Sequence, residues 1–277
     1  MQANYASTTA FTREQEGGYT NDAHDSGNWS SGIAGQGALI GSNMGCGAPA
    51  TIAYMAKVQP GFVVTADWMQ ALPPPVYDGM ATSAYWNPLQ CPDPRVLPGL
   101  DLALFDFGWN TGIGSSAKRL QWLIGAGQDG DIGNETLGIV QSCGLAPIAR
   151  ALSPADARTL QTQLGVTADG DVGDETLQAL AAQPSARPVV LLLGLGEAQA
   201  AYYRSLSNFS TYGDGWLART SARLAAGLSL AAGVAPAAKA LRMVGRAPSA
   251  IEPADAPAWR PFEPGRPIAA QAARPAA

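Results

Sequence analysis

Helix-length apolar segments, separated by glycine and proline, run through most of the chain and constrain its fold more than any other feature. The segment Leu97–Trp109 is strongly apolar and is typical of a buried central helix. Gly17-Gly18 ends a first helix expected over residues 5–16, because glycine is common just past a helix C-terminus. Patterns typical of strands are scarce. We therefore predict a mainly α fold, with a Gly-rich loop or small β-hairpin near the N-terminus, over residues 19–47. Further helices are expected at about residues 49–59, 65–72, 76–86, 115–124, 189–206 and 213–235.

An internal repeat with a register of 40 residues lies in the second half of the chain. Residues 120–137 read L-Q-W-L-I-G-A-G-Q-D-G-D-I-G-N-E-T-L, and residues 160–177 read L-Q-T-Q-L-G-V-T-A-D-G-D-V-G-D-E-T-L. Each unit predicts a helix, a tight Asp-Gly turn and a second helix that begins at Asn134 or Asp174. The D-G-D triplets also suggest calcium, but the ligand spacing of an EF-hand is absent. We interpret them as turns.

Composition and single residue types narrow the classes of function. The net charge of −5, with no basic cluster, argues against a nucleic-acid partner. Cys46, Cys91 and Cys143 form neither a CxxC pair nor a disulfide framework, so we expect small buried thiols. His24 is the only histidine, which argues against a zinc amidase site or a triad that needs His as its base. If the protein is an enzyme, carboxylates are the simplest remaining choice of catalytic group. We expect no metal and no cofactor.

The ends of the chain and one apolar run bear on where the protein acts. Residues 1–10 lack the basic start and apolar run of a signal peptide, so we expect synthesis in the cytoplasm. The run at residues 224–238 is short for a bilayer span, and we interpret it as a packed helix that ends near Pro236 rather than as a membrane segment. Residues 247–277 alternate Pro, Ala and Arg without a period and predict a disordered tail.

Polar residues are concentrated directly after Glu16, and this region carries a family resemblance. E-G-G-Y-T-N-D (16–22) and D-S-G-N-W (25–29), followed by A-Y-W-N-P-L (84–89) and L-D-L-A-L-F-D-F-G-W-N-T-G (100–112), resemble glycoside hydrolase family 108, the phage-type peptidoglycan lysozymes. The repeat at 120–137 resembles the predicted peptidoglycan domain that usually follows. A-Y-Y-R-S-L (201–206) and G-D-G-W-L-A-R (213–219) resemble the end of that domain. The resemblance covers roughly residues 8–230.

This resemblance implies a lysozyme-like α fold and an enzyme of the lysozyme or endolysin type. Such an N-acetylmuramidase hydrolyses the β-1,4 bond between N-acetylmuramic acid and N-acetylglucosamine in peptidoglycan glycan strands, here for host cell lysis. Glu16 matches the family's catalytic glutamate. We predict a lysozyme-like catalytic region over residues 1–112, packed with a helical, peptidoglycan-binding-like region over residues 113–235. Without a signal peptide, the protein would act in the periplasm or cell wall after release through a phage holin or another export route.

The spacing of Glu16, Asp25 and Ser31 supplies a second argument. Phage lysozymes carry a Glu, eight residues, an Asp, five residues and a Thr, and this chain reproduces that spacing with Ser for Thr. Glycoside hydrolysis uses one protonated carboxyl group and one carboxylate. A glutamate at a helix end can keep its proton against an apolar wall such as Tyr19 or Trp29, whereas Asp25 in a polar loop stays ionised. The Ser31 hydroxyl can hold the attacking water.

Several assignments stay open. Asp22 competes with Asp25 for the second carboxylate, and Asp25 can instead be a turn residue that bonds its own backbone. Ser42, in G-S-N-M-G (41–45), competes with Ser31 for a position usually held by Thr. Some candidates either contact sugar or serve the fold, namely Tyr85, Trp86, Trp109 and Asn110. Departures from the family are Cys46, where Ile is expected, the doubled repeat and the acidic charge. Alternative functions are a non-catalytic peptidoglycan-binding or virion-associated protein and a chitinase-like glycosidase.

Overall fold

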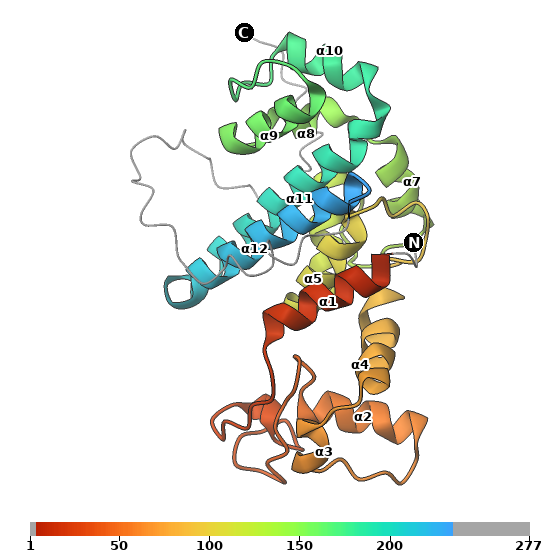
Figure 1. Cartoon of the computed structure of the whole chain (residues 1–277), viewed down its shortest axis with the longest axis vertical. Helices are drawn as coiled ribbons and strands as arrows, with labels where there is room; N and C mark the ends of the chain where they lie inside the picture. Colours follow the sequence, from red (N-terminus) through yellow and green to blue (C-terminus); the bar gives the residue numbers. More distant parts are fainter. Residues whose placement is uncertain (1–3, 235–277) are drawn as a thin grey trace. The chain divides into compact units, whose positions relative to one another are not determined.

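The computed structural model describes residues 4–234, and over this range the fold is mainly α, as predicted (Figure 1). The expected helix end near Pro236 and the tail at 247–277 lie outside the described residues. The α-helices are α1 (Tyr5–Glu16), α2 (Ala48–Val58), α3 (Ala66–Gln70), α4 (Pro74–Ala81), α5 (Leu100–Thr111), α6 (Ile113–Ile124), α7 (Asn134–Ser142), α8 (Leu145–Arg150), α9 (Pro154–Leu164), α10 (Asp174–Ala182), α11 (Arg187–Arg204) and α12 (Phe209–Ala231). Three short helical turns complete the order: η2 (Ser26–Asn28), η3 (Thr82–Trp86) and η4 (Pro184–Ala186).

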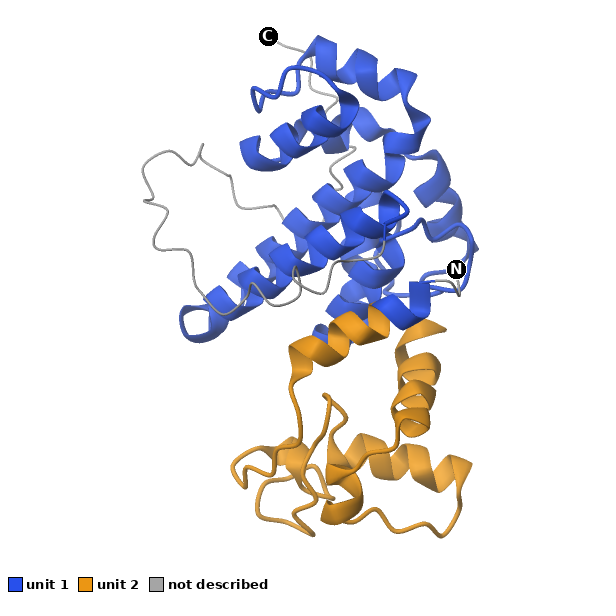
Figure 2. Ribbon diagram, in the orientation of Figure 1, with its two compact units in different colours: residues 1–7, 89–277 blue, residues 8–88 orange. Residues whose placement is uncertain are grey.

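Spatial contacts divide the chain into two compact units (Figure 2). The small unit is residues 8–88, and the large unit is residues 1–7 with 89–277. The predicted domain division, with its boundary at residue 112, rests on family motifs rather than on contacts and stays a prediction.

The small unit combines a Gly-rich loop with helices α2, α3 and α4. The loop contains three isolated antiparallel bridges, between Thr20 and Ser42, Trp29 and Leu39, and Asn43 and Cys46. Between residues 4 and 234 no bridge extends into a named strand, so the loop alternative of the prediction holds.

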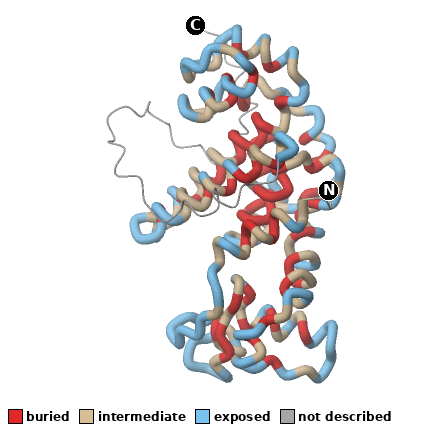
Figure 3. The backbone as a smooth tube through the Cα atoms, viewed as in Figure 1, coloured by how far each residue is buried: buried red, intermediate tan, exposed pale blue. Residues whose placement is uncertain are grey.

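The large unit is built around α5, whose residues Leu100 to Gly108 are all buried (Figure 3). Helix α5 packs against α6, α11 and α12, and α11 packs along α12. Ser116 of α6 donates a 2.8 Å hydrogen bond to the carbonyl of Leu104, which ties α6 to α5. The prediction of a buried central helix is therefore confirmed, with the helix beginning at Leu100 rather than near Leu97.

The two sequence repeats fold into the same hydrogen-bonded unit. Gln121 is buried, and its amide nitrogen donates to the Asp129 carboxylate (2.6 Å), the Asp131 carbonyl (2.8 Å) and the Thr136 hydroxyl (3.2 Å). Its amide oxygen accepts from the backbone N–H of Gly130 at 2.9 Å. In the second repeat, Gln161 makes the equivalent four bonds, with Asp169, Asp171, Thr176 and Gly170. In each repeat the shared glutamine therefore holds the D-G-D turn and the threonine of E-T-L together through hydrogen bonds, which confirms the interpretation of D-G-D as a turn.

The expectation of small buried thiols is met for two of the three cysteines. Cys46 and Cys91 are buried free thiols, whereas Cys143 is only half-buried. Among residues 4–234, no single helix has the length and hydropathy to cross a membrane. Two consecutive helical segments, Asp174–Ala182 and Pro184–Arg204, reach that length and hydropathy when they are taken together, but the chain bends by 102° between them.

Candidate active site

Glu16 is the last residue of α1, at the point where the chain turns into the Gly-rich loop. Gly17 follows with φ of 73°, a left-handed conformation that glycine adopts without the steric cost of a Cβ atom. The Oε1 atom of Glu16 is buried, although the residue as a whole is only half-buried. The helix end therefore fixes the position of this carboxyl group at the start of the loop.

Cys46 and Tyr85 lie within electrostatic reach of Glu16. Burial raises the pKa of the Cys46 thiol to about 12, and the negative charge of Glu16 contributes to the shift. Burial also raises the pKa of Tyr85, with smaller contributions from Cys46 and Glu16. Tyr85 belongs to η3, a π-helical turn, and such turns are frequent at functional sites. The small unit therefore gathers a carboxyl group, a thiol and a phenol in one neighbourhood.

The loop returns beside the end of α1 because its backbone pairs with the residues after Glu16. Thr20 and Ser42 exchange two backbone hydrogen bonds of 2.9 and 2.8 Å, and the Tyr19 hydroxyl donates to the Ile40 carbonyl at 3.1 Å. Gly41 lies under the Tyr19 ring: a Cβ atom there would stand 2.5 Å from Tyr19 Cε2, and its φ is 88°. Any larger residue at Gly41 would therefore displace Tyr19, the residue proposed as a wall for Glu16.

The two candidate second carboxylates are both exposed and both bond within the loop. Asp25 caps η2, where its Oδ1 accepts from the Gly27 N–H at 2.8 Å. Asp22 accepts from the backbone N–H of His24 (2.9 Å) and lies 3.0 Å from His24 Nδ1, and these bonds lower its pKa. The turn role foreseen for Asp25 is present. Both carboxylates stay candidates for the second role.

The two candidate hydroxyls differ in how they are engaged. The Ser31 hydroxyl donates to the Gln36 carbonyl at 2.8 Å and accepts from the Ile33 N–H at 3.1 Å, so it closes an exposed turn. Ser42 instead pairs through its backbone with Thr20, four residues after Glu16. The Ser31 side chain is thus already engaged in holding the loop.

The aromatic candidates of the small unit fall into two groups. Trp86 is 2% exposed, so it packs in the core and offers no surface on which a sugar could stack. Tyr19, Trp29 and Tyr85 are half-buried. The indole N–H of Trp29 donates to the Ala23 carbonyl at 2.9 Å and pins its ring to the loop. Asn28, absent from the sequence-derived candidates, anchors the same loop: it is fully buried, and its carbonyl accepts from the N–H groups of both Ile40 and Gly41.

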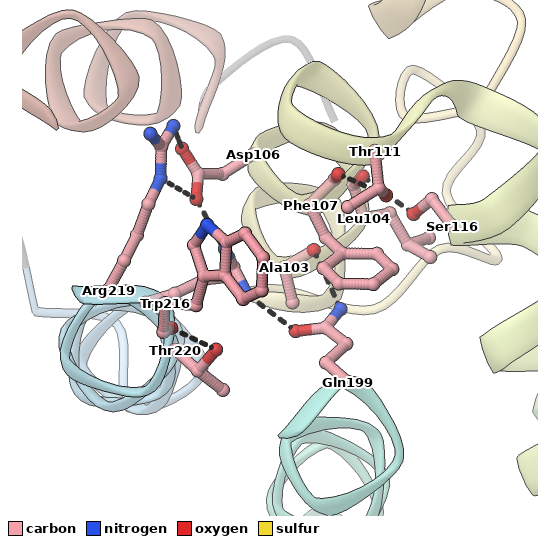
Figure 4. Close-up of polar contacts among 11 residues, drawn as sticks. Ala103, Leu104, Asp106, Phe107, Thr111, Ser116, Gln199, Trp216, Arg219 and Thr220 are labelled. Atoms are coloured by element: carbon pink, nitrogen blue, oxygen red, sulfur yellow. Dashed lines mark hydrogen bonds and ion pairs between the residues drawn. The ribbon is translucent and has the colours of Figure 1, made fainter. Parts of the chain in front are cut away.

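Trp109 and Asn110 lie at the end of α5 in the large unit. Trp109 contacts Phe105 at 5.7 Å between ring centroids. The Asn110 side-chain amide is oriented with its oxygen toward Arg219, and this oxygen accepts a hydrogen bond of 3.1 Å from the guanidinium group. One helical turn earlier, Asp106 is fully buried and bonds the Arg219 guanidinium (Figure 4). Its carboxylate also accepts a hydrogen bond from Arg223 at 2.7 Å. Burial alone would raise the pKa of Asp106, but the two guanidinium groups hold it at about 2. This ion-pair network was not foreseen from the sequence.

Comparisons with known proteins agree with this arrangement. Residues 9–112 match the family model Glycosyl hydrolase 108, and residues 155–221 match the model Predicted Peptidoglycan domain. Residues 9–112 are therefore a glycosyl hydrolase 108 region, which this chain combines with a predicted peptidoglycan domain. This family region contains Glu16, both candidate second carboxylates and every other residue proposed for the site. The first sequence repeat lies between the two matched regions.

One solved structure adds support for the fold of the chain. The structure of Brucella abortus SagA aligns with a TM-score of 0.54 and 22% identity, over 83% of this chain and 97% of that one. At that identity the likeness shows the fold alone. No curated protein matches the chain. Residues 4–234 contain no group of three or more His, Cys, Asp or Glu side chains placed to hold a metal ion.

Proposed function

We propose that this protein is an N-acetylmuramidase that cleaves the β-1,4 bond after N-acetylmuramic acid, with Glu16 as the general acid. The observation that carries the proposal is the position of Glu16 within the matched family region, at a helix end, with its Oε1 atom buried. Such a carboxyl group can protonate the oxygen of the departing sugar, while a second, ionised carboxylate directs water or stabilises the positive charge on the sugar ring.

The large unit would attach the enzyme to its substrate. Residues 155–221 match a domain whose description names peptidoglycan, which supports binding of the same polymer. We further propose that the protein reaches the cell wall after release from the cytoplasm, through a holin or another export route, and takes part in host cell lysis.

The test is hydrolysis of purified peptidoglycan by the wild type and by Glu16→Gln. The amide is nearly isosteric but cannot donate the proton, so the rate should fall by about 10²–10⁴-fold while the protein stays folded. New reducing ends that carry muramic acid identify a muramidase, because borohydride reduction converts only the sugar at the cleaved end. Unchanged activity of Glu16→Gln would remove Glu16 from the role of acid.

The same assay separates the alternatives. Binding to peptidoglycan without any new reducing ends would indicate a non-catalytic wall-binding protein, and release of chitooligosaccharides from chitin would indicate a chitinase-like enzyme. A parallel comparison of Asp25→Asn with Asp22→Asn assigns the second carboxylate, because only the residue that serves the reaction should cost about 10²-fold in rate when it loses its charge.

A further inference from the structure

A row of aromatic rings leads from the core of the large unit to its surface. Tyr203 at the end of α11 is 2% exposed and stacks on Trp216 of α12, with ring centroids 5.2 Å apart and planes at 22°. Trp216 is half-buried and contacts Tyr212 at 5.7 Å. Tyr212 is 56% exposed, which makes it one of the large hydrophobic side chains most open to solvent in the described chain.

Within the platform formed by Tyr212 and Trp216, the Trp216 ring is held in place by its neighbours. Phe107 of the buried helix α5 contacts the Tyr203 ring edge-on at 5.4 Å, so Trp216 stacks on a ring that is itself fixed. Arg219, one turn after Trp216 on the same helix, is tied to Asp106 through two hydrogen bonds of 3.1 and 2.7 Å (Figure 4). Rings positioned in this way lose little conformational freedom when a ligand binds.

The chemistry of the platform fits a glycan. The C–H groups on one face of a sugar ring carry partial positive charge and pack against the negative face of an aromatic ring. Asn110 and Arg219 add polar groups on the same part of the unit, where the Asn110 oxygen accepts from the guanidinium.

We propose that Tyr212 and Trp216 form a glycan-binding subsite that holds a peptidoglycan strand by stacking against its sugar rings. Both residues lie in the region matched as a predicted peptidoglycan domain. The inference rests on the proposal that the large unit attaches the protein to peptidoglycan, but it requires no bond cleavage.

The experiment measures co-sedimentation of the full chain with insoluble peptidoglycan. All variants carry Glu16→Gln, so that the polymer is not degraded during the measurement. Tyr212→Leu removes the ring, and Tyr212→Phe is the matched control that keeps the ring and loses only the hydroxyl. Because Tyr212 is largely exposed, both variants should unfold at the temperature of the parent.

We expect Tyr212→Leu to weaken binding about 3- to 10-fold and Tyr212→Phe to bind like the parent. Equal binding by Tyr212→Leu and the parent would overturn the subsite, and so would equal losses in both variants, because the hydroxyl rather than the stacked ring would then be responsible. Hydrolysis measured separately in the Glu16-intact protein shows whether the proposed muramidase activity stands or fails independently.

Discussion

At the scale of single residues, the Cys46 thiol is made inert by its surroundings. It is 2% exposed, and burial beside the Glu16 charge raises its pKa to about 12. Only the thiolate is strongly nucleophilic, so at pH 8 almost no Cys46 is reactive. We predict that a thiol reagent such as iodoacetamide leaves Cys46 unlabelled in the folded protein, as measured by mass spectrometry of the digested chain.

The half-buried Cys143 and the unfolded chain provide the controls for this prediction. Cys143 should label faster than Cys46, and all three cysteines should label in guanidinium chloride. Rapid labelling of Cys46 in the folded protein would show that this thiol is open to solvent, which would contradict its burial beside Glu16.

The sequence identified a candidate acid more readily than the residues that surround it. Glu16 was chosen as the candidate because a glutamate at a helix end before a Gly-Gly pair is visible in one stretch of sequence. The neighbourhood of Cys46 was not found, because 29 residues separate it from Glu16 in the sequence and only folding brings the two together. Its one signal was a cysteine where the family has isoleucine. The core position of Trp86 likewise depends on tertiary packing that no local pattern encodes.

At the scale of elements, each repeat depends on one buried glutamine. Gln121→Ala and Gln161→Ala each remove four hydrogen bonds and leave turn groups without their partner, which should cost about 1–3 kcal/mol. The most direct readout is hydrogen exchange at Gly130 and Gly170, whose N–H groups donate to these glutamines.

We predict that each variant accelerates exchange in its own turn and leaves the other turn unchanged. Gln163→Ala is the matched control, since Gln163 is an exposed glutamine on the same helix as Gln161. Faster exchange in both turns for either single variant would show that the repeats unfold together rather than as separate stapled units.

Helix boundaries show where local patterns suffice and where they mislead. The range predicted for the first helix, residues 5–16, is the observed one, because Gly17 takes the left-handed conformation that ends it. Helix α12 begins at Phe209, four residues before the predicted start at residue 213. A Cβ atom at Gly213 would lie 2.6 Å from the Phe209 ring, so this glycine allows close packing within the helix. Helix α8 was missed because it has only six residues and contains Pro147.

At the scale of the whole molecule, buried carboxyl groups make stability depend on pH in two opposite directions. The Arg219 and Arg223 charges hold the pKa of Asp106 at about 2 in spite of its burial. A depressed carboxyl pKa contributes stability that is present above the ordinary value of 3.8 and is lost as the pH falls toward 2. Protonation of Asp106 therefore destabilises the folded protein only in strong acid.

Asp156 acts at the other end of the pH range. Burial, a hydrogen bond with Glu197 and repulsion from its charge raise the pKa of Asp156 to about 7. Above pH 3.8 the unfolded chain releases a proton that the folded chain still holds, so stability falls as the pH rises toward 7 and then levels off. The Ser153 backbone N–H donates to Glu197 at 3.1 Å, which keeps this second carboxyl group in place next to Asp156.

We predict that Asp156→Asn removes this loss, because the amide stays neutral and can still donate to Glu197. At pH 8 the thermal midpoint of this variant should exceed that of the wild type by about 2–4 °C, equivalent to roughly 1 kcal/mol. The effect is this small because Asp156 is only half-buried and water screens its interaction with Glu197. At pH 4 the two proteins should unfold at similar temperatures. Asp174→Asn, which removes one charge from the exposed start of α10, controls for the change in net charge. The midpoints of Asp156→Asn and the wild type could instead differ by the same amount at pH 4 and pH 8. That result would mean that Asp156 and Glu197 do not share a proton in the folded protein.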